Sequence, residues 1–63
     1  MNVTRRQAQV LDALCEYGHN KLMARALKVE VKAVEAMMTR IKQSTGIDSR
    51  VVLAVQWDRQ RRR

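Results

Sequence analysis

The side chains that could do chemistry in this 63-residue chain are few and scattered. There is one cysteine, one histidine and six carboxylates. His19 has no second histidine or second cysteine beside it, so a zinc site would lack donors, and no two acids share one helical face in the apolar setting that general acid catalysis needs. Cys15 follows Ala13 and Leu14, which favours a small core residue over a reactive thiol. We therefore expect no catalytic residue, no metal site, no cofactor and no enzyme activity.

Positive charge is the strongest functional signal. Thirteen Lys and Arg against six Asp and Glu leave a net charge of +7, which indicates a polyanionic partner, either nucleic acid or an anionic membrane surface. Residues 59–63 hold four arginines and no acid, so residues 1–58 keep nine basic side chains against six acids, a net charge of +3. The sequence predicts a domain over 1–58 and an arginine-rich tail over 59–63. The tail is either a phosphate-contacting arm or a solvated end.

A membrane partner fits the sequence poorly. The longest fully apolar run, residues 51–55, has five residues, whereas a span needs about 20. The basic residues do not gather on one helical face opposite aromatic side chains. A lone cysteine suits a reducing compartment, and no signal peptide precedes the first amphipathic segment. We expect a soluble cytoplasmic protein that does not bind membranes.

Composition and capping signals predict an all-α fold with an aliphatic core. The chain has no proline, no phenylalanine and two glycines, too little turn chemistry for a β-sheet. Thr4 and Gln7 have the spacing of a capping box for a first helix, which should end near Tyr17, before Gly18. Asn20 is the expected N-cap of a short second helix.

A third helix is expected from about Glu30 to the cap residue Gly46. No glycine or asparagine marks the break at Lys28, so one continuous helix over 20–45 is the alternative. At 100° per residue, one stripe is buried and the opposite face is exposed. The buried stripe comprises Val34, Met38, Ile41 and Thr45; the opposite face comprises Lys32, Ala36, Thr39 and Gln43, flanked by Glu35 and Arg40.

The fourth helix, capped by Asp48 or Ser49 and running to about Asp58, is apolar nearly all the way round. A domain this small cannot bury every side of such a helix, and a second copy is the simplest partner. The predicted homodimer interface comprises Val51, Val52, Leu53, Val55 and Trp57. Four short helices, with about three residues between the second and third, describe a helix-turn-helix unit.

The same residues resemble a known family. From Val3 to about Ala54 the chain is similar, without a gap, to the LuxR/GerE-type DNA-binding domain. The residues that carry the resemblance are Val3-Thr4, Arg6, Val10-Leu11, Leu14, Asn20-Lys21, Ala24-Arg25, Leu27, Val29, Val34, Arg40-Ile41, Gly46-Ile47 and Ser49-Arg50. The resemblance implies a small tetrahelical domain that reads the major groove of duplex DNA with its third helix and dimerises through its fourth. It also implies a prokaryotic or phage-type, nucleoid-associated protein.

The chain departs from the family pattern mainly in the third helix. Glu30 occupies a position where the family usually has Ser or Thr, and Ala33 a position where it usually has Thr. Glu35 replaces a usual Lys, and Met37 replaces a usual His. Gln7 and Gln9 replace two usual glutamates of the first helix. Glu30 and Glu35 add charge that DNA repels, so the resemblance implies an atypical recognition helix.

Two hypotheses for the function follow. The leading one is a standalone transcriptional regulator that binds double-stranded DNA as a dimer; the alternative is a protein-interaction module that pairs with a larger LuxR-type regulator and blocks it. A third hypothesis is a detached module like region 4 of a sigma factor. The Gly-Ile-x-Ser-Arg motif at residues 46–50 favours the LuxR/GerE type instead. The predicted DNA-binding residues are Asn20, Lys21, Lys32, Glu35, Ala36, Thr39, Arg40, Gln43 and Arg50.

Overall fold

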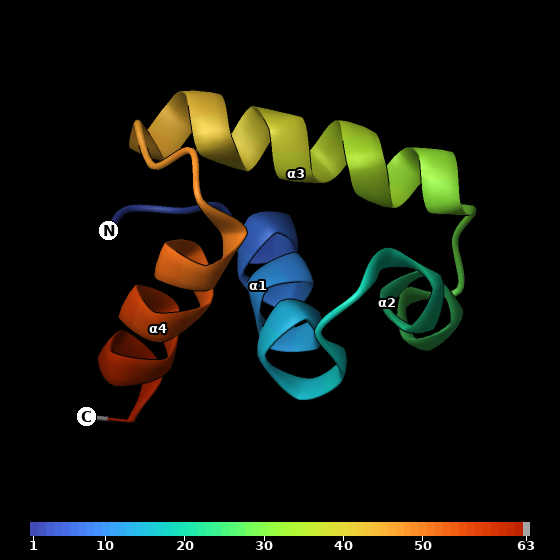
Figure 1. The fold of residues 1–63 in the computed structure, drawn as a ribbon, viewed down its shortest axis with the longest axis horizontal. Coiled ribbons are helices and arrows are strands. Elements are labelled where there is room, and N and C mark those ends of the chain that lie inside the picture. Colours follow the sequence, from blue (N-terminus) through green and yellow to red (C-terminus); the bar gives the residue numbers. More distant parts are fainter. Residues whose placement is uncertain (63) are drawn as a thin grey trace.

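The computed structural model describes residues 1–62 and contains four α-helices in that range. They are α1 (Arg5–Tyr17), α2 (Asn20–Leu27), α3 (Val31–Thr45) and α4 (Arg50–Arg61). α1 packs against each of the other three, and α3 lies across the group (Figure 1). The prediction of a small all-α domain with four helices is confirmed.

The caps at the ends of α1 and α3 follow the sequence signals. The Thr4 hydroxyl accepts from the Gln7 backbone N–H at 3.1 Å, and the Thr4 N–H donates to the Gln7 side chain at 3.1 Å. Gly18 and Gly46 end α1 and α3 in the left-handed region, at φ 81° and 74°. These positive φ angles suit glycine because a Cβ would meet the following carbonyl.

The chain forms two separate helices, α2 and α3, so the alternative of one continuous helix over 20–45 is wrong. Lys28 ends α2 in the left-handed conformation (φ 59°), although it is not a glycine. The Val29 N–H donates to the Ala24 carbonyl at 3.0 Å and closes the turn. Glu30 then becomes the N-cap residue of α3. The helix-turn-helix connection therefore spans only residues 28–30.

The expectation that Asn20 caps α2 is wrong. His19 occupies the N-cap position without a side-chain capping bond, and Asn20 is the first helical residue. The Asn20 Oδ1 instead accepts a hydrogen bond from Arg50 at 3.0 Å. A charged donor from α4 thus takes the carbonyl oxygen that a local cap would have used.

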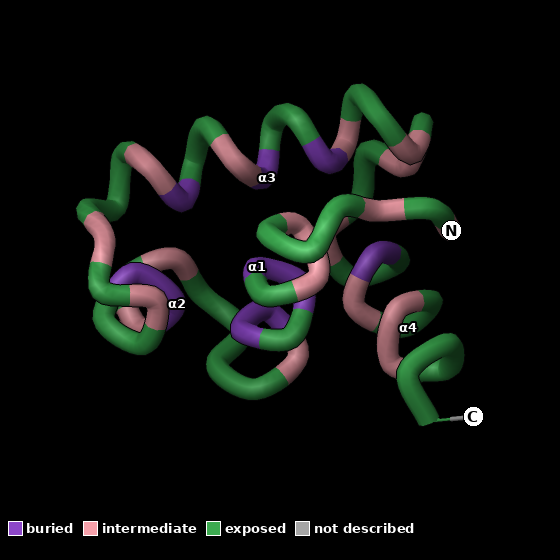
Figure 2. Tube along the Cα trace, turned by 180° about the vertical axis from the view of Figure 1, so that it is seen from behind, coloured by how far each residue is buried: buried purple, intermediate pink, exposed green. Residues whose placement is uncertain are grey.

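The core is aliphatic and centred on α1. Figure 2 shows the buried segments along α1 and on the sides of the other helices that turn toward it. Ile47 and Trp57 pack against this cluster from its edge. Thr45, expected in the buried stripe, is half-buried and donates its hydroxyl proton to the Ile41 carbonyl at 2.7 Å. The buried residues are Val10, Leu11, Ala13, Leu14, Met23, Ala24, Val34, Met38, Ile41 and Leu53.

The C-terminal helix is longer than expected. α4 continues past Asp58 to Arg61, so most of the predicted tail is helical. Arg61 forms ion pairs with Asp12 at 3.3 Å and Asp58 at 3.2 Å, and Arg62 pairs with Asp58 at 2.9 Å. These contacts tie the end of α4 to itself and to α1. Arg63 lies outside the described residues.

Candidate nucleic-acid interface

The outward face of α3 presents a row of exposed polar and small side chains. Val34, Met38 and Ile41 on its inner side are buried. The Thr39 hydroxyl donates to the Glu35 backbone carbonyl at 3.0 Å, which fixes the side chain and leaves its methyl group and lone pairs free. Every predicted contact residue of α3 is exposed: Lys32, Glu35, Ala36, Thr39, Arg40 and Gln43.

The two edges of this face differ in charge. At 100° per residue, Glu35 and Arg40 lie on opposite sides of a line through Ala36 and Gln43. Arg40 faces the first turns of α1, where it lines a groove with Arg6. The edge that carries Arg40 is therefore basic, whereas the other side of the α3 face carries Glu35 together with Lys32.

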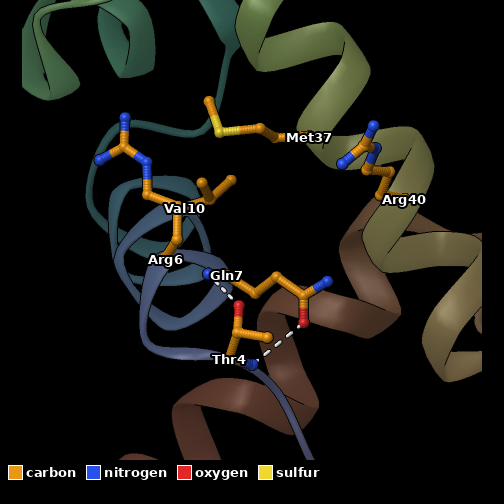
Figure 3. Close-up of a pocket in the computed structure, with 6 residues that line it drawn as sticks. All are labelled: Thr4, Arg6, Gln7, Val10, Met37 and Arg40. Atoms are coloured by element: carbon orange, nitrogen blue, oxygen red, sulfur yellow. Dashed lines mark hydrogen bonds between the residues drawn. The ribbon is translucent and has the colours of Figure 1, made fainter.

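The basic edge contains a groove between α1 and α3 of about 220 Å³. Val10 and Met37 contribute apolar side chains to it, and Arg6 and Arg40 contribute guanidinium groups (Figure 3). Arg6 was not among the residues predicted for the site. Its sequence position gives no signal for this role, because only the packing of α1 against α3 brings it near Arg40.

Asn20 and Arg50, two of the predicted DNA contacts, are engaged inside the domain. Arg50 is half-buried, and its Nη2 donates to Asn20 Oδ1 at 3.0 Å, to the Gly18 carbonyl at 3.4 Å and to Met23 Sδ at 3.4 Å. Its Nε is buried without a partner in residues 1–62. These contacts join the start of α4 to the start of α2 and occupy the Nη2 of Arg50 and the Oδ1 of Asn20 within the domain. Lys21 remains exposed.

The predicted dimer interface divides in two. Leu53 is completely buried and Trp57 packs against the core, with its Nε1 donating to Asp12 Oδ1 at 2.8 Å. Including Leu53 in the dimer interface was wrong, because its side chain is completely buried in the core. Trp57 is half-buried and its indole N–H is engaged by α1. Val51, Val52 and Val55 remain exposed, with 69%, 41% and 46% of their surface accessible.

The one cysteine behaves as a half-buried structural residue. Its Sγ donates to the Ala54 carbonyl at 3.4 Å. Burial raises the pKa of the Cys15 thiol, and the nearby Arg61 charge offsets this only in part. Desolvation lowers the pKa of Arg61, but its hydrogen bonds to Asp58 and Asp12 more than compensate, so this pKa lies above its ordinary value.

The histidine and the carboxylates of the described part of the chain do not cluster. His19 is exposed, and residues 1–62 contain no group of three His, Cys, Asp or Glu side chains that could hold a metal ion. None of the four helices has both the length and the apolar character that crossing a membrane requires.

No protein-family model, curated protein or solved structure matches this chain. The resemblance to LuxR/GerE-type domains therefore stays a prediction that rests on the residues quoted for it.

Proposed function

We propose that this protein is a transcriptional regulator that binds duplex DNA by placing α3 in the major groove. The observation that carries the proposal is the outward face of α3, a surface helix that follows α2 after a three-residue turn. Its 15 residues make a rod of about 22 Å. The major groove, about 12 Å wide, admits one helix of this kind.

The side chains on this face have the chemistry for reading bases. Gln43 can pair with the N6 and N7 of adenine, and the methyl groups of Ala36 and Thr39 can contact the thymine methyl. Glu35 can accept from the N4 amino group of cytosine. A good bidentate pair contributes roughly 1–3 kcal/mol of discrimination against the wrong base. Lys32 and Lys21, both exposed, are placed to neutralise phosphates.

Dimer formation through α4 belongs to the same proposal. Val51, Val52 and Val55 form an apolar stripe on the side of α4 that the domain leaves exposed. A two-fold contact between two such stripes would bury all three valines on each chain. Two copies of α3 could then read successive half-sites, about 34–36 Å apart.

A protein-interaction module is the second candidate, and one observation favours it. Glu35 is exposed, as is Val31 one turn earlier, with 41% of its surface accessible. The Glu35 carboxylate repels a phosphate backbone, whereas the exposed Val31 side chain can pack against the apolar part of a protein partner. In this alternative the chain pairs with a larger regulator and blocks it.

Replacing Glu35 by lysine separates the two candidates. For a DNA reader, Glu35→Lys should tighten binding to random duplex, steepen the slope of log affinity against log salt by up to about 0.9, and change the preference at one base position. For an interaction module, it should create DNA binding where the wild type has none and weaken the protein complex.

The matched control is Glu16→Lys, which makes the same charge change at an exposed position of α1. It should raise DNA affinity less than Glu35→Lys and change no base preference. Equal effects of the two substitutions would show that α3 is not the working face.

A further inference from the structure

The geometry points to a two-arginine clamp in which Arg6 of α1 and Arg40 of α3 grip one DNA phosphate at the basic edge of α3. This inference rests on the proposed function and extends the interface to a second helix. Arg6 and Arg40 lie 34 positions apart in the sequence but line the same groove.

Both guanidinium groups are available to an anion. Arg6 is exposed, and its Nη1 donates one hydrogen bond to Gln9 Oε1 at 3.0 Å. Gln9 is uncharged, so this bond leaves the positive charge of Arg6 uncancelled. Arg40 is exposed and makes no ion pair or side-chain hydrogen bond within residues 1–62. An arginine carries five N–H donors, so most of the donors in the pair remain free.

The groove contains nothing that would compete with an anion. Its lining comprises Thr4, Arg6, Gln7, Val10, Met37 and Arg40, and no carboxylate is among them. In Figure 3 the two guanidinium groups lie on either side of the Met37 side chain. Two like charges that share a groove repel each other, and a phosphate between them converts this repulsion into two attractive, potentially bidentate contacts.

The position of the groove favours a DNA phosphate over a free anion. Arg40 borders the α3 face that carries Ala36, Thr39 and Gln43. When a helix lies in the major groove, the sugar-phosphate backbone runs along its edges, and contacts there fix the register of the helix. On the opposite side of the face Glu35 repels phosphate and Lys32 attracts it, whereas the groove of Arg6 and Arg40 contains no carboxylate.

The test is a fluorescence-anisotropy titration of a random-sequence duplex with Arg6→Ala, Arg40→Ala and the double variant at several salt concentrations. Arg5→Ala is the matched control, because Arg5 is exposed on α1, does not line the groove and forms no ion pair within residues 1–62. Each single variant should lose roughly tenfold in affinity. The double variant should lose little more, because both side chains hold the same phosphate, and its salt slope should flatten by about 0.9.

Three outcomes would overturn the clamp. If the wild type binds and the double variant matches Arg5→Ala, the groove does not meet the backbone, while the proposed function stands. If the two single losses multiply and the salt slope falls by about twice 0.9, the arginines contact separate phosphates. If the wild type binds no duplex, the clamp and the proposed function fail together. Circular dichroism melting of every variant establishes that each one is folded.

Discussion

Replacing Leu53 by alanine tests how α4 is shared between the core and a partner. Leu53 is completely buried, whereas Val55, two positions later, has 46% of its surface accessible. A buried Leu→Ala substitution costs about 2–5 kcal/mol. At about 0.05–0.15 kcal/mol per residue, a chain of this length has a total stability of only about 3–9 kcal/mol. Leu53→Ala should therefore lower the melting temperature by about 10 °C or more.

Val55→Ala is the matched control on the same helix. In the monomer it should change the free energy of unfolding by no more than about 0.5 kcal/mol, because it is a surface substitution. In the dimer its effect should grow with protein concentration, because association stabilises the folded chain by mass action. The loss caused by Leu53→Ala arises within one chain and should be similar at every concentration.

The assay is urea unfolding followed by circular dichroism, at two protein concentrations that differ by about a hundredfold. A cost below about 1 kcal/mol for Leu53→Ala would refute the packing of α4 on α1. Equal costs for Leu53→Ala and Val55→Ala at low concentration would refute the division of α4 into a core side and a partner side.

Three further predictions concern the dimer, the turn and the cysteine. Val55→Glu should shift the sedimenting mass from dimer to monomer, while Gln60→Glu, at an exposed position on another side of α4, should not; a wild type that is monomeric at high concentration contradicts the interface. Lys28→Gly should raise the free energy of unfolding by roughly 0.5–1 kcal/mol, because glycine adopts a positive φ without steric cost; a lower melting temperature would show that the positive φ of Lys28 carries no such cost. Because burial raises the pKa of Cys15, its thiolate fraction at a given pH is smaller when folded, so iodoacetamide should alkylate it more slowly than in urea and the rate profile should lie at higher pH. Identical profiles would show that the thiol is not shielded.

The features that the sequence predicted correctly are local. Thr4 with Gln7, and the glycines at 18 and 46, act within one turn of chain, so their spacing defines the ends of α1 and α3. The buried stripe of α3 follows from helical periodicity alone. The Lys28 turn was the weakest local signal, because a left-handed lysine has no pattern of its own.

The features that the sequence missed depend on contacts between helices. From the sequence, Arg50 was predicted to contact DNA, but in the structure it donates a hydrogen bond to Asn20 of α2. Trp57 looked like an interface residue, but Asp12 of α1 accepts its indole N–H. The arginine run was expected to be a phosphate-contacting arm or a solvated end after the last helix, yet Arg61 lies within α4 and pairs with Asp12 and Asp58. A pattern of residue types does not specify which of these partners each side chain meets.

Selection of bound duplexes from a random pool at two salt concentrations tests most directly whether α3 reads DNA sequence. A base reader should enrich one motif at both salts, with weaker overall binding at the higher salt. The motif should change when Gln43, on the outward face of α3, is replaced by alanine. Salt-sensitive binding without an enriched motif, or no binding at all, would contradict the claim.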